Sequence, residues 1–556
     1  MLLRPASHAV APPLQTRQRA RLSCCRAAGA SDGLLQPRRP QRRVAGGGGG
    51  SAGGGSFRES GRRRFEPRDE GEAPVPQEPI QPRLLTTIIK EAASIEHLAR
   101  ITDAQGSRFN FIHTAAAFAR AGKLAGSGAA RPADAYPLLR GLSALLEPQL
   151  DDCGTREHAN VVWACAKAGY AEPVPLLEAC FARLADRSAE ATSQGLANAL
   201  WAAAKLRLAV PEQQAAQLLS ALVAQQQAAT PQNLANTLWA AATLQLAVPE
   251  QQAAQLLSAL VAQRQAAKPQ EISNALWAAA TLQLAVPEQQ AAQLLSALVA
   301  QQQAATPQAL ANALWAAATL QLTVPEQQAA ELLSALVAQR QAATPQNLAN
   351  TLWAAAKLCG SAAPPDVEAA LLRLAAAVDE RLVAAMNGQD VSNSLWALSQ
   401  LGLRPAPLTQ RLADVAMPLA PAMTPQHLAN TALAAAKLGV GGTVLFAALA
   451  GAAGRQLQGF TTQNLCNLAW ALAIADQRQL AGAAVALAQR AATAEVWAQT
   501  VAEDHGQLHQ VHVWLMGLDG RGLSGALSPA QLRECEAAWE ARPRGQPAAS
   551  KKRRAA

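Results

Sequence analysis

The chain has 556 residues, of which half are hydrophobic, 4% aromatic and 16% charged. Alanine and leucine supply most of the apolar content, which suits close-packed helices and argues against a β-sandwich, a fold rich in β-branched and aromatic residues. The net charge of +9 belongs to the two ends: residues 1–72 hold 14 Arg against 6 acids, and residues 541–556 hold six basic residues and no acid. The sequence between them is net acidic, so the high pI is no argument for a basic nucleic-acid surface on the folded part.

Membrane and disulfide classes are also excluded. No run of about 18 apolar residues is free of polar interruption, so no membrane span is expected. The eight Cys residues form no CxxC pair, and their spacing predicts neither a disulfide framework nor a zinc site. We expect small buried thiols in a reducing compartment.

The first segment has the composition of a targeting sequence. Residues 1–31 carry five Arg and no acid, and they lack the hydrophobic core of a secretory signal, which predicts an organellar transit peptide. The stretch LSCCRAAGA looks like an algal chloroplast processing region, so the chloroplast stroma is the expected location. The mitochondrial matrix is the alternative, and a plain disordered tail also fits. Residues 32–82, rich in Gly, Pro and Arg, are predicted to be a disordered linker.

A motif built around Asn-x-x-Trp recurs through the middle of the chain. Its Trp falls every 38 residues from Trp163 to Trp353 and again at Trp396 and Trp470, with Leu433 in the Trp place between these last two. Self-similarity at this period predicts a solenoid. The expected fold is all-α: a right-handed α-solenoid of stacked helix-hairpin repeats with a period of about 38 and disordered N-terminal and C-terminal ends.

Each repeat divides into two helices. In the repeat that starts at Thr230, Thr is a natural N-cap, Pro231 suits the first helical position, and Leu234 and Leu238 begin an apolar stripe. Pro249 is expected to open a second helix, so that helices of about 14 and 18 residues fill the period. Neither helix can bury its apolar side alone, so the repeats must stack on their neighbours.

Atypical copies are expected to cap the array. Phe118 and Trp514 mark degenerate outer copies of the motif. The predicted segments are N-terminal capping helices with a degenerate repeat at 83–150, the repeats at 151–475, C-terminal capping helices at 476–543, and a basic disordered tail at 544–556.

The fixed Asn and Trp are predicted to form the frame of each repeat. At about 100° per residue, Asn236 lies nearly opposite the core side of its helix, with Trp239 beside it. Because Asn is poor inside a helix, we expect it to hydrogen-bond to the first helix of the next repeat, and Trp to anchor packing between repeats. Contact with a ligand is the alternative for both. The frame residues are Asn198, Trp201, Asn236, Trp239, Asn274, Trp277, Asn312, Trp315, Asn350, Trp353, Asn393 and Trp396.

Two positions of the motif vary, the x positions of PQxLANxLW, one helical turn apart and therefore on one face. A fixed frame with one variable pair per repeat suits a modular RNA reader, in which each repeat reads one base with two or three side chains. Drift at exposed positions is the alternative. The candidate RNA-binding pairs are Glu157 and Val161, Gly195 and Ala199, Asn233 and Thr237, Glu271 and Ala275, Ala309 and Ala313, Asn347 and Thr351, Asp390 and Ser394, His427 and Thr431, and Asn464 and Leu468.

The motif LANTLWAAAKL and its relatives, over about residues 155–475, resemble the octotricopeptide repeat proteins of green algal organelles. The resemblance implies an α-solenoid that binds single-stranded organellar RNA. The stretches at 86–124, 505–515 and 528–543 look like the lead-in helices and the pre-RAP segment of that family and of the related FAST-kinase-like RNA-processing proteins. No RAP domain follows, so the nuclease-like fold is not found and no enzyme is expected.

Charge and chemistry restrict the function further. Residues 193–358 hold six cations against six acids, so phosphate neutralisation would have to come from the outer repeats, helix termini, the backbone or a partner. The sequence holds no P-loop, HExxH, GxSxG or dinucleotide fingerprint. His505, His509 and His512 share one face of a predicted helix, but no clear fourth ligand lies nearby, so no metal and no cofactor are predicted.

The sequence therefore favours an organelle-targeted, sequence-specific RNA-binding repeat protein that acts in RNA stability, in processing of rRNA or mRNA, or in translation. A protein cofactor or ribonucleoprotein complex is a further expected partner, and DNA is not. A protein-binding α-solenoid scaffold is the alternative, motivated by the neutral, Gln-rich array. A RAP-type RNA-processing nuclease is the second alternative, if the sequence stops short of a RAP domain.

Overall fold

The structure is a computed structural model that describes residues 81–128 and 131–542. Helices are the regular elements throughout this described part. It divides into two compact units, the first ending at Val248 and the second beginning at Pro249. The predicted transit peptide, nearly all of the linker, and the basic tail lie outside the described residues.

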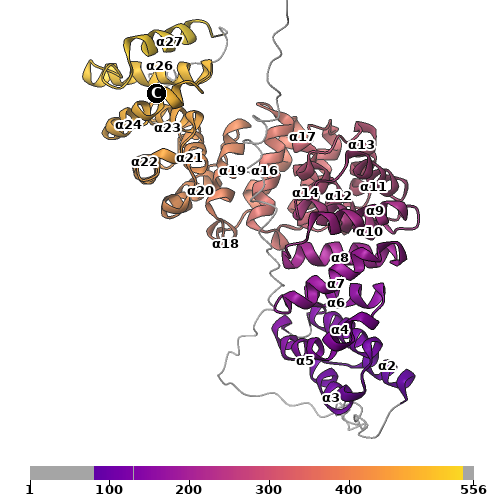
Figure 1. The fold of residues 1–556 in the computed structure, drawn as a ribbon. Helices are drawn as coiled ribbons and strands as arrows, with labels where there is room; N and C mark the ends of the chain where they lie inside the picture. Colours follow the sequence, from indigo (N-terminus) through magenta and orange to yellow (C-terminus); the bar gives the residue numbers. More distant parts are fainter. Residues whose placement is uncertain (1–80, 129–130, 543–556) are drawn as a thin grey trace, which may run out of the picture. The chain divides into compact units, whose positions relative to one another are not determined.

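In the first unit, one helix of each repeat forms a layer and the other helix covers it (Figure 1). The first helices α4, α6, α8 and α10 pack in series, and α5, α7 and α9 each pack on the first helix that precedes them. The helices are α2 (Pro82–Glu91), α3 (Ile95–Gln105), α4 (Phe111–Gly126), α5 (Tyr136–Leu146), α6 (Thr155–Ala168), α7 (Val174–Asp186), α8 (Ser193–Leu206), α9 (Glu212–Ala224) and α10 (Pro231–Thr243).

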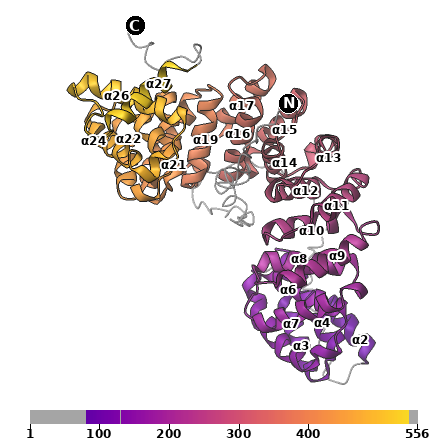
Figure 2. The same cartoon turned by 45° about the horizontal axis from the view of Figure 1, so that its top comes forward.

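The second unit repeats this arrangement (Figure 2). Its first helices α12, α14, α16, α19, α21 and α23 pack in series, and α26 and α27 close the end beyond α23. The helices are α11 (Glu250–Ala262), α12 (Pro269–Leu282), α13 (Glu288–Ala300), α14 (Pro307–Thr319), α15 (Glu326–Ala338), α16 (Pro345–Cys359), α17 (Pro365–Ala377), α18 (Glu380–Ala384), α19 (Gly388–Gln400), α20 (Ala406–Leu419), α21 (Pro425–Leu438), α22 (Gly442–Gly454), α23 (Thr462–Ile474), α24 (Ala481–Ala491), α25 (Ala494–Trp497), α26 (Ala502–Asp519) and α27 (Pro529–Glu540). Within each unit the predicted all-α solenoid of helix hairpins is confirmed.

Local sequence sets the start of each first helix. The Thr230 hydroxyl accepts a hydrogen bond from the Asn233 amide at 3.3 Å, and Pro231 opens α10, as predicted. The second helix begins at Glu250 but spans 13 residues, shorter than expected. It ends because Gln263 leaves the helical conformation, its amide bonding Leu260 O in a tight turn.

A residue in the left-handed conformation ends several of the first helices. Gln245 has φ +55° and Gln283 has φ +57°, whereas the corresponding residues of other repeats are Gly402 (φ +67°) and Gly439 (φ +75°). A left-handed residue at this place lets its amide close the last helical turn. Glycine takes this conformation freely, and a side chain with a Cβ atom takes it at a cost.

The outer copy of the motif in α4 differs by one residue from the prediction. Phe118 is fully buried, like the core Leu238 of α10, and the half-buried Ala119 takes the Trp place. Phe118 is therefore a core residue and not the counterpart of Trp. The two neighbouring helices approach closely here, because a Cβ atom on Gly122 would lie only 2.7 Å from the Cα of Ala164.

Two exclusions made from the sequence hold for the described part of the chain. No helix there is long and apolar enough to span a membrane. Five of its six cysteines are buried free thiols, and Cys359 is half-buried. Burial raises the pKa of the Cys153 thiol to about 11 and that of Cys165 to about 12, so these thiols are packing residues and not nucleophiles.

Candidate nucleic-acid interface

The first helices leave one narrow stripe of side chains exposed. In α10 the stripe is Gln232, which is exposed, with Asn236, Trp239 and Thr243, which are half-exposed. These positions follow the spacing i, i+4, i+7 and i+11, so they lie in a row along one side of the helix. The same row is Arg156, Asn160, Trp163 and Lys167 in α6; Gln194, Asn198, Trp201 and Lys205 in α8; Gln270, Asn274, Trp277 and Thr281 in α12; and Gln426, Asn430, Leu433 and Lys437 in α21. We call this row the polar–aromatic stripe.

The predicted variable pairs lie elsewhere. Their second members expose no surface at all: Val161, Ala199, Thr237, Ala275, Ala313, Thr351, Ser394, Thr431 and Leu468 are each 0% exposed. Their first members are buried or half-buried: Ala309, Asn347, Asp390, Asn233 and Asn464 are at most 9% exposed, and Glu157, Gly195, Glu271 and His427 are half-buried. The expectation that both variable positions face outward as readers is wrong for the second member of every pair.

Packing on both sides of each first helix explains this burial. Within each unit, first helices such as α6, α14 and α19 contact the preceding first helix, the following one and their own second helix. The second variable position lies between neighbouring first helices, where small residues allow close approach. The hydroxyls of Thr237, Thr351 and Thr431 are buried there with no hydrogen-bond partner among the described residues, so they are not available to a ligand.

The first variable position has a local task in several repeats: it caps its own helix. The Asn347 side-chain oxygen accepts from the Thr344 amide at 3.0 Å, and the Thr344 hydroxyl accepts from the Asn347 amide at 3.2 Å. Glu271 and Asp390 reach back in the same way to the backbone amides that precede their helices. The reciprocal pattern, present at Thr344 and Asn347 and at Asn387 and Asp390, is the capping box, whereas Glu271 makes only the bond to the Lys268 amide. The variation of residues at the first variable position therefore reflects helix capping as much as the recognition of a ligand.

The recurring Asn residues of the repeats do not form the predicted hydrogen-bonded ladder. Across repeats, only Asn467 makes such a bond in the described chain, accepting from the Gln507 side chain at 2.9 Å. Asn274 accepts from Gln270 of its own helix at 2.7 Å. Asn236 and Asn312 make no side-chain hydrogen bond to any described residue. Their amides are left half-exposed on the stripe.

The Trp residues of the stripe are half-exposed, with the exception of Trp315, which is 6% exposed. Some are bridged by lysine. The Lys167 ammonium lies 5.8 Å from the ring centre of Trp163 and 5.3 Å from that of Trp201, one repeat later. Lys357 lies in the same way at 5.7 Å from Trp353 and 5.1 Å from Trp396. Trp thus contributes to packing between repeats, as predicted, while part of each ring stays accessible.

A different side chain links the two helices of a single repeat. Gln225 donates to the carbonyl of Ala191 at 2.8 Å, Gln301 to that of Ala267 at 3.1 Å, and Gln456 to that of Met423 at 3.0 Å. Each Gln follows a second helix, and each acceptor precedes the first helix of the same repeat. The recurrence of Gln at this place was visible in the sequence, but its role was not predicted.

A groove crosses α2, α4, α6 and α8 of the first unit, with a volume of about 710 Å³. Its lining includes four basic side chains, Lys90, Arg120, Lys123 and Arg156, against the single acid Glu157. Arg120 donates from Nε to the carbonyl of Ala92 at 2.7 Å, which fixes its guanidinium at the end of α2.

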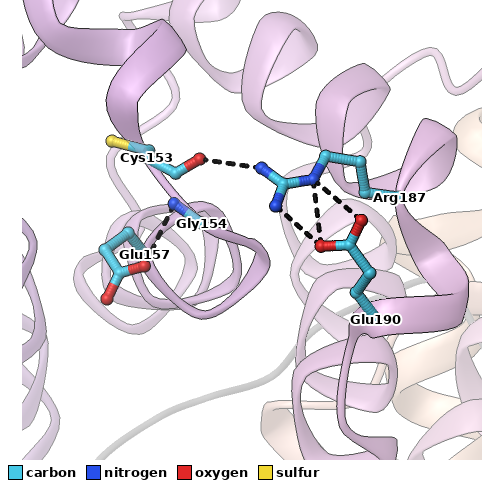
Figure 3. A network of polar contacts seen from close by, with 5 residues as sticks. All are labelled: Cys153, Gly154, Glu157, Arg187 and Glu190. Atoms are coloured by element: carbon cyan, nitrogen blue, oxygen red, sulfur yellow. Dashed lines mark hydrogen bonds and ion pairs between the residues drawn. The ribbon is translucent and has the colours of Figure 1, made fainter.

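A polar network holds the start of α6 at the edge of this groove (Figure 3). Glu157 accepts from the Gly154 amide at 3.2 Å. Arg187 donates to the carbonyl of Cys153 at 3.3 Å and pairs with Glu190 at 2.6 Å. The carboxylate of Glu157 is therefore directed at its own helix N-terminus, where the helix dipole favours negative charge.

The three histidines of α26 contact separate partners. His505 stacks on Trp497 at 4.8 Å between ring centres, His509 stacks on Trp539 at 5.7 Å, and His512 accepts from the Leu523 amide at 2.9 Å. Among the described residues, no group of His, Cys, Asp or Glu is arranged to hold a metal ion.

Comparisons with known proteins add little to this geometry. No protein-family model matches the chain, and no curated protein matches it in sequence. Among known structures, it is similar to a homology model of the full-length AP-3 complex in an intermediate open conformation, with 10% sequence identity and a TM-score of 0.31, over 83% of this chain and 89% of that chain. That likeness is too weak to carry an argument, so the octotricopeptide resemblance stays a prediction.

Proposed function

We propose that the chain binds single-stranded RNA along the polar–aromatic stripes of its first helices. The observation that carries this proposal is the stripe itself. Most copies present an amide or a cation, then Asn, then Trp, then Lys or Thr, whereas α21 has Leu433 in the Trp place and the stripes of α19 and α23 end in Gln400 and Ile474. In Asn236 and Asn312 the amide makes no hydrogen bond to any described residue. Asn is unfavourable inside a helix, so a partner outside the chain is a physical reason for its presence.

The stripe offers the three contacts that single-stranded RNA uses. Half-exposed Trp rings can stack on bases, Asn and Gln amides can hydrogen-bond to base edges, and Lys can neutralise phosphates. Lys ends the stripe at 167, 205, 357 and 437, whereas Thr ends it at 243, 281 and 319. Readout would therefore come from the stripe and not from the buried variable pairs.

The biological role that fits this binding is an effect on RNA stability, processing or translation in an organelle, without catalysis by the chain itself. The composition of residues 1–31 supports the organellar location, and the octotricopeptide resemblance supports the RNA partner. A protein-binding scaffold is the rival, and the test below separates the two.

The test is cross-linking and pull-down of organellar RNA by the full chain. The variant combines Asn198→Ala, Asn236→Ala and Asn312→Ala, and the matched control combines Gln213→Ala, Gln251→Ala and Gln289→Ala, three exposed amides on second helices. Because Ala is a better helix residue than Asn, the variant should remain folded. We expect wild type and control to enrich the same transcript and the Asn variant to lose it. Enrichment of proteins alone, surviving nuclease, would favour the scaffold.

A further inference from the structure

The groove over α2, α4, α6 and α8 has cations that no other group in the described chain neutralises. Lys90, Lys123 and Arg156 are exposed and form no ion pair there. The single lining acid, Glu157, is occupied by the Gly154 amide. The groove therefore presents a net positive field in a concave site, where field lines concentrate and attract anions.

Small residues of α4 explain why the groove is hollow. Ala116 and Ala119 of α4 stand where later first helices carry Asn and Trp, and both line the groove. Ala115 and Ala159 complete a floor of small apolar side chains. Trp163 of α6 borders this space. The missing Trp of α4 leaves room for a flat ring beside Trp163.

We propose that this groove binds a nucleoside phosphate, with the base against Trp163 over the alanine floor and phosphate groups on the rim cations Lys90, Lys123 and Arg156. The volume of about 710 Å³ lies within the range of small-ligand sites. An aromatic wall with a rim of cations is the combination that nucleotides require. An apolar or cationic ligand would leave the rim charges unsatisfied.

The proposal rests on the proposed function in one respect: the nucleotide is taken to be part of the bound RNA. A free nucleotide has the same chemistry and is the other source. If the nucleotide belongs to RNA, the first unit supplies phosphate neutralisation that the electrically neutral residues 193–358 lack. Most of the salt dependence of binding would then arise in this groove.

The test uses the full chain and two variants. The first variant combines Lys90→Gln, Lys123→Gln and Arg156→Gln, and its control combines Arg83→Gln, Arg108→Gln and Arg140→Gln, three exposed cations of the same unit that do not line the groove. The second variant is Ala119→Trp, which restores the side chain that later repeats carry and fills the hollow. Circular dichroism checks that each remains folded.

Two ligands are titrated: a single-stranded RNA that the wild type enriches, at several salt concentrations, and a nucleoside monophosphate. We expect the groove triple variant to bind RNA about tenfold or more weakly, with a slope of log K against log salt smaller by about 2, since each lost phosphate contact on a single strand contributes about 0.7. The control should keep the wild-type slope. Ala119→Trp should lose monophosphate binding.

The outcomes separate this proposal from the proposed function. RNA binding in which both groove variants behave like the control would overturn the groove and leave the stripe as the RNA site. Monophosphate binding that Ala119→Trp abolishes, with no RNA bound by the wild type, would support the groove as a free-nucleotide site and overturn RNA binding. A wild type that binds neither ligand would overturn both.

Discussion

Gln225 donates a hydrogen bond from its side-chain amide to the backbone carbonyl of Ala191, 2.8 Å away and 34 residues earlier in the chain. The acceptor residue is buried, so the carbonyl has little access to water. The bond ties the end of the second helix of a repeat to the chain just before its first helix. It thereby holds the two helices of one repeat together, whereas the sequence predicted side-chain hydrogen bonds of Asn between neighbouring repeats.

Removing this link should destabilise the first unit. Gln225→Met keeps the length of the side chain but leaves the Ala191 carbonyl unsatisfied, which costs about 1–3 kcal/mol. The measurement is urea unfolding followed by circular dichroism. Gln227→Met, at an exposed neighbouring position, is the control and should change stability by less than about 0.5 kcal/mol. Equal losses in the two variants would count against the link.

The left-handed glutamines offer a stabilising change. Gln245→Gly, Gln283→Gly and Gln321→Gly each relieve a positive φ of 55–57°, and we expect each to raise stability by about 0.5–1 kcal/mol. Gln251→Gly makes the same replacement inside α11, where it should lower stability by about 1 kcal/mol. Thermal unfolding of the four single variants compares the signs. A loss at Gln245, Gln283 and Gln321 would show that their side chains contribute more than the strain costs.

A substitution at Thr237 tests whether the second variable position serves packing or the recognition of RNA bases. Its hydroxyl is buried without a partner in the described chain, and other repeats carry Ala at this place. Thr237→Val keeps the shape and removes the unsatisfied group, so stability should stay level or rise by about 1 kcal/mol. The RNA preference of the chain should not change. The measurement is a selection from random single-stranded RNA. A changed sequence preference of the variant would show that the variable pairs take part in RNA recognition.

His158 makes the stability of the first unit depend on pH. Burial, together with the nearby Arg183 and Arg187, lowers the pKa of His158 to about 4. In the unfolded chain a histidine titrates near 6.5. Between pH 4 and pH 6.5 the imidazole of His158 is protonated in the unfolded chain and neutral in the folded chain. The contribution of His158 is therefore complete above about pH 6.5 and is lost as pH falls toward 4.

The expected loss over this window is about 2–3 kcal/mol. His158→Leu keeps an apolar side chain of similar size and should remove this part of the pH dependence, even if its stability at pH 7 differs from that of the wild type. The melting temperature at pH 7, 6, 5 and 4.5 measures the difference. Parallel pH profiles for the two proteins would exclude His158 as the source.

Much of the architecture could be read from the sequence because it follows from local rules. The constant step between Trp residues indicates stacked units, and Thr-Pro pairs such as Thr230 and Pro231 mark helix starts that the structure confirms. The degenerate copy in α4 was placed one residue off at Phe118. The contact between α4 and α6 determines which residues of α4 are buried, and this contact cannot be inferred from local sequence patterns.

The sequence by itself determined the period, the helix hairpins and the apolar stripe of each helix, because helical periodicity and capping act within about one turn. Only the tertiary structure decided which of the remaining positions are open. A first helix inside a unit, such as α14, is packed on three sides, so the burial of Ala313 and the half-exposure of Asn312 depend on neighbouring repeats. Alanine and threonine suit a crowded interface and a solvated surface alike. Their place was therefore decided by packing between repeats, which lies beyond the reach of periodicity in a single helix.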